Sequence, residues 1–213
     1  MTNPEKVARY WGKLADVYDE NELLAGDTYP PIIAKLKSEF NPNDRLLDVG
    51  AGTGLLTAHV VPLVGHVTCT DIAPEMLEKA RTRLANFNHV DYRVEDAAAL
   101  SFDDHSFDVV LCCNVLHQMA DPEVAVGEFH RVLRPGGRLL AITLTEGDMS
   151  SWSKLRTGIE YVLRFGVPPA RHPFKLSTFS QLIAGAGFDV VEAVLVTREP
   201  MPTAYVSAIK PSS

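Results

Sequence analysis

Apolar residues in this chain fall into two alternating patterns, short continuous runs and sets spaced three or four residues apart. Continuous runs are typical of strands buried in a parallel sheet, and the spaced sets are typical of helices packed against one. The runs predict strands at 45–49, 66–70, 90–94, 109–113, 138–145, 190–197 and 204–210. The spaced sets predict helices within 4–39, directly after residue 54, from residue 74, around 124–133 and over 177–186.

The alternation of these elements decides the expected fold. Strands that alternate with helices form a parallel sheet with helices on both faces and right-handed crossovers. The last two strands are joined by the six residues 198–203, which is short enough for a hairpin. We therefore predict a doubly wound α/β fold with a mostly parallel seven-stranded sheet and an antiparallel strand at the C-terminal end.

Composition and charge exclude several classes of partner. The chain is 46% hydrophobic and 22% charged, which is ordinary for a globular protein. Its formal net charge of -7 and pI of about 5.5 offer no basic surface to a polyanion, so we expect no nucleic-acid partner. The N-terminal residues lack signal-peptide features, and no run approaches the roughly 20 apolar residues of a spanning helix. We expect a soluble cytoplasmic protein with no membrane partner.

Three cysteines, Cys69, Cys112 and Cys113, lie within apolar strand-like runs. None belongs to a Cys-x-x-Cys pair or has a histidine at metal-ligand spacing. A disulfide between the adjacent Cys112 and Cys113 would strain the backbone. We expect buried free thiols and no metal site.

One stretch carries the clearest chemical signal, Leu46-Leu47-Asp48-Val49-Gly50-Ala51-Gly52-Thr53-Gly54. An apolar run that ends in a carboxylate and passes into alternate glycines is typical of a strand leading into a nucleotide-binding loop. Without Cβ atoms, the glycines let the backbone turn sharply and approach a ligand. A helical pattern follows at once, so we expect the loop at a helix N-terminus with free N–H groups.

The spacing of these glycines limits the class of ligand that the loop can bind. A Gly-x-Gly-x-x-Gly dinucleotide fingerprint would need glycine in place of Leu55, and no Gly-Lys-Ser/Thr follows as in a triphosphate-binding loop. What remains is a nucleoside-like ligand across the strand ends, where open α/β sheets bind small molecules.

Several segments agree in order and spacing with motifs of the class I methyltransferases that use S-adenosylmethionine. Residues 47–54 resemble the family's first motif, whose loop contacts the methionine portion of the cofactor. Asp71 is similar to the acidic residue that binds the ribose hydroxyls, and Ile72 to the residue that packs on the adenine. Asp96–Ala97 resembles the segment that reads the adenine amine and ring edge.

Later segments extend the likeness over about 45–145, because 106–110 with 116–117 resembles the fourth-strand motif and 131–137 the motif before the fifth strand. The resemblance implies a Rossmann-like fold, S-adenosylmethionine as cofactor and methyl transfer to a small-molecule acceptor, in a monomer or homodimer. The alternatives are a same-fold protein with other chemistry and a non-catalytic ligand-binding protein. The candidate cofactor-binding residues are Tyr18, Asp48, Gly50, Ala51, Gly52, Gly54, Asp71, Ile72, Met76, Asp96, Ala97 and Asn114.

The length of 213 residues suits one well-buried core, and nothing in the composition marks a second domain. We therefore expect a single methyltransferase domain. Its parts are an N-terminal helical lid (1–40), the cofactor-binding core (41–145), an inserted substrate cover (146–175) and a C-terminal helix with strands (176–213).

The carboxylates also make chemical sense without the resemblance. Asp71 can accept two hydrogen bonds from a vicinal diol, and its alternative role is that of a solvated loop acid. Asp48 lies too early for a ribose contact, so it bonds loop N–H groups, approaches the ligand's ammonium or is structural. Asp96 reads the adenine or caps a helix. Tyr18, within an N-terminal Tyr-Asp pair, closes over the cofactor or packs a helix.

Catalytic residues are harder to recognise in the sequence than cofactor-binding residues. Methyl transfer from a sulfonium needs in-line positioning and exclusion of water, and it needs a base only when the acceptor must lose a proton. His117, just beyond the fourth strand, and His172, in the cover, have side chains whose ordinary pKa suits a base. Their alternative roles are in the cofactor pocket or in the structure.

Substrate identity should reside in the cover, because function lives in the site grafted on a shared fold. Its aromatic residues suggest an apolar or aromatic acceptor, or form the core of a small helical cap; they are Trp152, Tyr161, Phe165 and Phe174. Its basic residues would hold an acidic substrate group or form a solvated face; they are Lys154, Arg156, Arg164 and Arg171.

Overall fold

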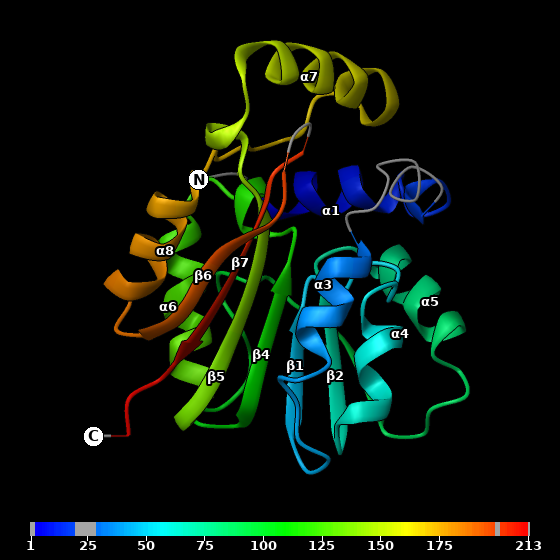
Figure 1. Cartoon of the computed structure of the whole chain (residues 1–213). Helices are drawn as coiled ribbons and strands as arrows, with labels where there is room; N and C mark the ends of the chain where they lie inside the picture. The colour runs from blue at the N-terminus through cyan, green and yellow to red at the C-terminus, as the bar shows by residue number, and fades with distance from the viewer. Residues whose placement is uncertain (1–2, 20–28, 199–200, 213) are drawn as a thin grey trace.

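A single mixed sheet organises the computed structural model of the chain, which describes residues 3–19, 29–198 and 201–212 (Figure 1). Its strands lie in the order β3-β2-β1-β4-β5-β7-β6. They are β1 Arg45–Val49, β2 His66–Asp71, β3 Val90–Val94, β4 Phe107–Cys113, β5 Leu133–Leu144, β6 Asp189–Thr197 and β7 Thr203–Ile209. Neighbouring strands are parallel except that β7 runs antiparallel to both β5 and β6. The predicted seven-stranded, mostly parallel sheet is confirmed.

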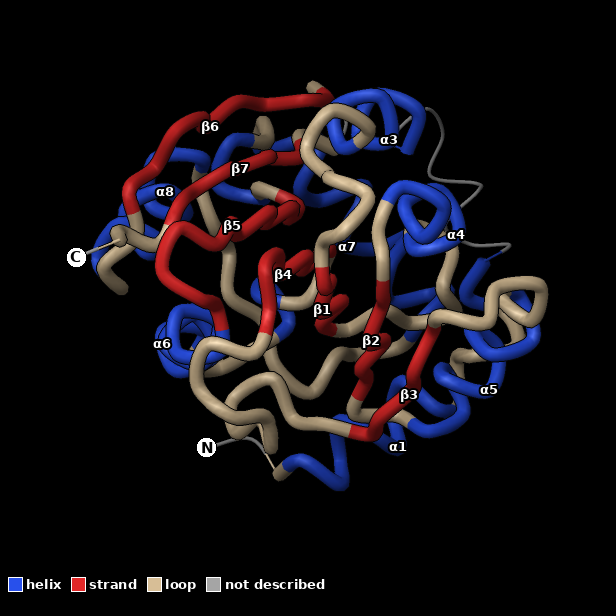
Figure 2. The backbone as a smooth tube through the Cα atoms, turned by 90° about the horizontal axis from the view of Figure 1, so that it is seen from below, coloured by secondary structure: helices blue, strands red, loops and turns tan. Residues whose placement is uncertain are grey.

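Helices cover both faces of this sheet (Figure 2). They are α1 Pro4–Gly12, α3 Tyr29–Leu36, α4 Thr57–Val60, α5 Pro74–Arg83, α6 Pro122–Val132, α7 Ser151–Phe165 and α8 Leu176–Gly185. One hydrophobic cluster, with Phe129 and Phe179, joins α6 and α8 to the sheet. A second cluster, with Leu36 and Leu77, joins α3, α4 and α5 to it. The helices α1 and α7 lie above the carboxyl ends of the parallel strands (Figure 1).

The start of α1 follows from its sequence. The side chain of Asn3 caps the helix by accepting a hydrogen bond of 2.9 Å from the Glu5 N–H, and Pro4 occupies the first turn. Of the helical pattern that we expected within 4–39, the first helix ends at Gly12, where α1 approaches α5. A Cβ at Gly12 would lie 2.5 Å from Oε2, at the flexible end of the Glu75 side chain.

The helix after the glycine loop is short. The helix α4 has four residues, and a 3₁₀ turn, Val61–Leu63, continues it. Pro62 lacks an N–H group and therefore cannot extend the α-helical hydrogen bonding. The expected helix after the glycine loop is therefore present, although it is short.

The strand β5 begins earlier than we predicted, at Leu133 and not at Arg138. The segment 134–137, which the motif places before the strand, lies within the bounds of the strand as an irregularity, with Gly136 at φ 74°. The register with β4 shifts between Phe107 and Val109, which accommodates it.

The topology fixes where a ligand can bind. From β1 the chain moves outward to β2 and β3 and then returns to β4 on the other side of β1. Ligands of open α/β sheets bind beyond the carboxyl ends of the strands, beside such a reversal. The glycine loop follows β1, and Asn114 follows β4, so both stand at this point.

Candidate active site

Two cavities, of about 450 and 430 Å³, share the lining residues Trp11, Tyr18, Asn114 and Gln118. The first, which we call the strand-end cavity, is lined by the glycine loop, the ends of β1, β2 and β4, and α1. The second, the cover cavity, lies between the end of β4 and α7. The shared lining makes the two cavities neighbours with a common wall.

Most of the predicted cofactor residues line the strand-end cavity: Tyr18, Gly50, Gly52, Asp71, Ile72, Met76, Asp96, Ala97 and Asn114. These come from segments far apart in the sequence, and the parallel sheet brings them to one edge. Asp48, Ala51 and Gly54 line neither cavity. The nomination of these three residues as ligand contacts stays a prediction.

The glycines of the loop have two different purposes. Gly50, at φ 68°, lines the strand-end cavity, and a Cβ there would lie 2.1 Å from Cγ2 of Val115. Gly54, at φ 74°, faces α5, where a Cβ would lie 3.1 Å from that of Ala80. Gly50 thus allows a close approach at the site, and Gly54 packs the loop onto the fold.

Asp71 is held in position at the end of β2. One carboxylate oxygen accepts the Gly52 N–H over 3.0 Å, and the other accepts the Ala73 N–H over 2.9 Å. Removal from water raises its pKa to about 6, although these hydrogen bonds oppose the shift. Each oxygen keeps a lone pair for a further donor, so the side chain can accept from two hydroxyls of a ligand.

Asp96 lies at the neighbouring strand end and lines the same cavity. Its Oδ1 accepts the Ala98 N–H over 2.9 Å, and its backbone carbonyl accepts the Ala99 N–H over 2.9 Å. These bonds close a turn that presents Ala97 and Ala98 to the cavity. Asp96 therefore combines a turn-stabilising role with a place at the site.

Asp48 is buried behind the loop. Its Oδ2 accepts a hydrogen bond of 2.6 Å from the Thr57 hydroxyl in α4, and its carbonyl oxygen accepts one of 3.1 Å from the Thr70 hydroxyl. Burial raises the pKa of Asp48 to about 7. Of the roles that we left open, the structural one fits this geometry, because the carboxylate ties the loop region to α4.

His117 follows β4 and is buried. The amide nitrogen of Gln118 lies 2.8 Å from Nε2 of His117, and Nδ1 lies 2.9 Å from the Thr143 hydroxyl. An amide nitrogen only donates, so Nε2 accepts and Nδ1 carries the proton. Burial, with a smaller contribution from the charge of Arg171, lowers the pKa of His117 to about 4. The imidazole is thus neutral, with its basic nitrogen already engaged.

His172 lies outside the lining of both cavities. The ring of His172 packs against Phe174 at a centroid distance of 4.5 Å. The backbone N–H of His172 donates to the backbone carbonyl of His117 over 2.8 Å. These contacts fit a structural role and give no support to the base role that we considered.

The aromatic residues of the cover separate into three environments. Tyr161 and Phe165 line the cover cavity, together with Trp11 and Tyr18 from the N-terminal segment. Phe174 belongs to the hydrophobic core, and Trp152 is 71% exposed. Of the two roles that we left open for these residues, a wall for an acceptor fits Tyr161 and Phe165, and a core position fits Phe174.

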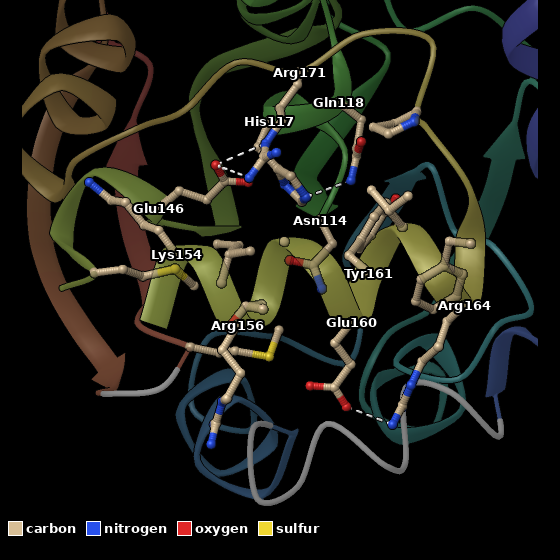
Figure 3. Close-up of a pocket in the computed structure, with 18 of the residues that line it drawn as sticks. Asn114, His117, Gln118, Glu146, Lys154, Arg156, Glu160, Tyr161, Arg164 and Arg171 are labelled. Carbon is tan, nitrogen blue, oxygen red and sulfur yellow. Dashed lines mark hydrogen bonds and ion pairs between the residues drawn. The ribbon is translucent and has the colours of Figure 1, made fainter. Parts of the chain in front are cut away.

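The polar lining of the cover cavity is partly paired (Figure 3). Arg171 holds Glu146 through hydrogen bonds of 2.8, 2.9 and 2.6 Å, and Arg164 pairs with Glu160 over 2.7 Å. Lys154 also lines the cavity and makes no ion pair with another residue of the described ranges. The cover cavity thus combines aromatic walls with an available cation.

Sequence reasoning missed several residues that shape the site. Trp11 and Gln118 line both cavities, but the only sequence signal was the position of Gln118 beside His117 after β4. Arg83 of α5 bonds the Thr53 carbonyl over 2.8 Å and forms an ion pair with Asp19, which also accepts from the Thr53 hydroxyl. This cluster fastens the N-terminal segment to the glycine loop.

Neither a membrane-spanning helix nor a metal-binding cluster is found among the described residues. None of their helices has the length and apolar character that crossing a bilayer requires. Nor do these residues contain a group of three or more His, Cys, Asp or Glu side chains arranged to hold a metal ion.

Comparison with known proteins places this geometry in a family. The family model described as "Methyltransferase domain" matches residues 47–141. The chain is 34% identical over 160 residues to the ubiquinone/menaquinone biosynthesis C-methyltransferase UbiE of Teredinibacter turnerae, covering 70% of this chain and 64% of that protein. It is 36% identical over 133 residues to a ubiquinone biosynthesis O-methyltransferase of Xanthomonas oryzae pv. oryzae, covering 62% and 55%. The matches span less than two thirds of the length of these relatives.

Solved structures share the fold. BH2331 of Bacillus halodurans matches with a TM-score of 0.71 at 20% identity, covering 84% of this chain and 98% of that one. The [4+2]-cyclase SpnF matches with 0.69 at 20% identity, covering 86% and 82%. The trans-methyltransferase CalH, in complex with S-adenosylhomocysteine, matches with 0.66 at 25% identity, covering 84% and 55%.

The fold, the glycine loop and the strand-end carboxylates are similar to those of the class I S-adenosylmethionine-dependent methyltransferases. Residues 47–141 of this chain match the model of the methyltransferase-domain family. The resemblance that we drew from the sequence motifs is confirmed, and the cofactor of this family is S-adenosylmethionine.

Proposed function

We propose that this protein binds S-adenosylmethionine in the strand-end cavity and transfers its methyl group to a small organic acceptor in the cover cavity. The observation that carries the proposal is the common wall of the two cavities, formed by Trp11, Tyr18, Asn114 and Gln118. Transfer of a group between two molecules requires them to be held end to end with water excluded. Adjoining cavities at the strand ends supply that arrangement.

The strand-end residues fit the cofactor. Asp71, already fixed by the Gly52 and Ala73 N–H groups, has the remaining lone pairs to accept from both ribose hydroxyls. Ile72 and Met76 line the same cavity and offer an apolar surface for the adenine ring. The left-handed backbone at Gly50 and Gly52 lets the main chain approach the methionine portion.

When bound, the cofactor supplies an electrophilic methyl group on a sulfonium. Bound in the strand-end cavity, it would supply this methyl group to the acceptor nucleophile and leave as S-adenosylhomocysteine. The protein's task is to orient and enclose the reactants. Gln118 and Asn114 stand on the common wall, where they can orient the reacting groups.

His117 acts in this proposal as a positioning residue and not as a general base. Its Nε2 accepts from the amide of Gln118 and so fixes that side chain, while Thr143 holds Nδ1. A group whose pKa is lowered to about 4 has little capacity to take a proton near neutral pH. The chemistry therefore depends on an acceptor that is nucleophilic in its own right or loses its proton to solvent.

The acceptor is an apolar or aromatic small molecule with an acidic or strongly polar substituent. Tyr18, Tyr161 and Phe165 provide the aromatic walls, and Lys154 provides a cation without an ion-pair partner in the described chain. The relatives named for quinone biosynthesis support an aromatic acceptor.

We also propose a cytoplasmic location. Cys69 and Cys112 are buried free thiols, as is usual for proteins of a reducing compartment. The acidic net charge of -7 agrees with a small-molecule acceptor in place of nucleic acid.

Incubation with methyl-labelled cofactor and a panel of phenols, hydroquinones and aromatic acids tests the reaction. Label in the acceptor together with stoichiometric S-adenosylhomocysteine is the expected result. Tight cofactor binding without turnover of any acceptor would favour a binding role instead. Conversion of an acceptor without transfer of label would favour the second candidate function, in which the bound cofactor supports a reaction other than methyl transfer. The likeness of the fold to that of the cyclase SpnF is the reason to retain this second candidate.

A further inference from the structure

Two aromatic side chains, Trp11 and Tyr18, belong to the wall that the strand-end cavity and the cover cavity share. The other two members of this wall are the amides Asn114 and Gln118, so none of the four carries a charge. A methyl group that passes between the cavities has to start at this wall, and so does the positive charge of the sulfonium that bears it. The charge of the reacting group therefore falls beside aromatic rings and amides.

The rings of Trp11 and Tyr18 form a corner. Their centroids lie 6.1 Å apart and their planes are inclined at 79°. The ring of Phe165, which lines the cover cavity, continues the set at 6.5 Å from Tyr18 and an inclination of 52°. Rings at such steep angles present faces in more than one direction, which is the arrangement of the aromatic cages that bind quaternary ammonium groups. A sulfonium is likewise a cation without an N–H group to donate.

The protein itself holds this pair of rings at the wall. Trp11 and Tyr18 pack on a small hydrophobic cluster whose buried members are Ala15, Ala73 and Met76. Asp19, the residue after Tyr18, forms an ion pair with Arg83 of α5. Because the rings are already ordered, little entropy is lost when a cation arrives between them.

The carboxylates near the wall have other positions. No carboxylate of the described residues lines both cavities. Those of the strand-end cavity line that cavity alone, and they are Asp71, Glu95, Asp96 and Asp121. Those of the cover cavity are paired with arginines, Glu146 with Arg171 and Glu160 with Arg164. Ring faces and amide oxygens are therefore the groups of the wall that can stabilise a cation, and a ring face attracts it more strongly once water is removed.

We infer, on the basis of the proposed function, that the ring faces of Trp11 and Tyr18 bind the sulfonium charge of S-adenosylmethionine and so distinguish the cofactor from its product. S-adenosylhomocysteine lacks the methyl group and the positive charge on sulfur, so a ring face attracts it less. The two rings thereby raise the affinity for the cofactor relative to the product. Other parts of the two molecules are identical, and contacts with them contribute equally to both.

Titration calorimetry with three ligands tests this inference without turnover. They are S-adenosylmethionine, S-adenosylhomocysteine and sinefungin, which carries an ammonium group in place of the methyl sulfonium. Trp11→Leu should weaken binding of the two charged ligands by roughly tenfold and that of S-adenosylhomocysteine by less than about threefold. Trp11→Phe keeps a ring face and should lose less. Tyr18→Leu and Tyr18→Phe should differ in the same order.

Tyr10→Leu is the matched control. Tyr10 also belongs to α1, and its ring lies 5.0 Å from that of Trp11, but it lines neither cavity. Loss of this aromatic side chain should change the affinities for the three ligands by the same factor. A general loosening of α1 is thereby separated from the loss of a ring face at the common wall.

Two results would overturn the inference. An equal loss for all three ligands in the leucine variants would mean that the rings only hold α1 in place. A loss for S-adenosylmethionine that spares sinefungin would mean that the wall recognises the methyl group and not the charge. If Trp11→Leu does not fold, the two Tyr18 variants decide between these outcomes. If the wild type binds neither cofactor nor product, the proposed function fails too, whereas tight binding with unchanged ratios contradicts the role of the rings alone.

Discussion

The amide nitrogen of Gln118 lies 2.8 Å from Nε2 of His117, so the histidine that follows β4 is an acceptor for its neighbour. Gln118 lines both cavities, whereas His117 carries its proton on Nδ1 toward Thr143. His117, which the sequence suggests as a general base, therefore positions Gln118, which lines both cavities.

His117→Phe should lower kcat/KM for the acceptor about fivefold, because Gln118 loses one neutral hydrogen bond of about 1 kcal/mol. His117→Gln should keep most of the activity, since its amide oxygen can still accept. Steady-state kinetics of both variants, with His172→Phe as a control outside the cavities, measures this. A loss of about 10²-fold or more in both variants would restore the base role.

Asp71→Ala should weaken binding of S-adenosylmethionine by roughly 1.5 to 3 kcal/mol, the scale of hydrogen bonds to a charged group. Titration calorimetry measures the change. Asp91→Ala is a suitable control, because Asp91 is an exposed acid on the adjacent β3 whose partner is His66, away from the cavities. Equal affinities of Asp71→Ala and wild type would contradict the ribose assignment.

The stability of the protein should depend on pH through Asp48. Its pKa is about 7 in the folded protein and about 4 when unfolded, so the folded state binds the extra proton between these values. The free energy of unfolding should therefore fall with rising pH, by at most about 1.4 kcal/mol per unit, until pH 7, and then level off.

Asp48→Asn removes this titration and keeps an oxygen for the Thr57 hydroxyl. Urea unfolding at pH 5 and pH 8 should show the variant gaining stability relative to wild type at the higher pH. A difference between the two proteins that is the same at both pH values would show that Asp48 titrates normally.

Gly50→Ala should destabilise the protein by about 2 to 4 kcal/mol, because it combines a left-handed φ of 68° with a Cβ placed 2.1 Å from Val115. Gly52→Ala should cost only about 1 kcal/mol, since its Cβ would meet nothing within 4 Å. Thermal unfolding of both variants compares them. Equal losses would mean that the contact with Val115 relaxes freely.

Sequence periodicity and glycine spacing determined the central architecture of this protein. Buried parallel strands are apolar along most of their length, so β1 and β4 can be recognised in the sequence as apolar runs. A strand that ends where the strand order reverses places the loop that follows it at the ligand-binding edge of the sheet. The resemblance to the methyltransferase motifs assigned Asp71 and Asp96 to one site although 25 positions separate them, and both line the strand-end cavity.

Local pattern was less reliable where packing competes with it. The helix after the glycine loop shortens at Pro62, and Asp48, which looks like a ligand contact in the motif, is held behind the loop by Thr57. The motif positions the backbone, but the direction of each side chain depends on what packs against it.

Only the tertiary structure decided the environment of each side chain. The neutrality of His117 follows from burial beside Arg171 and a hydrogen bond from Gln118, which a sequence does not display. The placement of Trp11 on the common wall follows from the crossing of α1 over the strand ends. The same apolar spacing in α7 is compatible with a core-facing or an outward-facing helix, because periodicity defines a face without giving its direction. The packing of Tyr161 and Phe165 against the cover cavity turns that face outward.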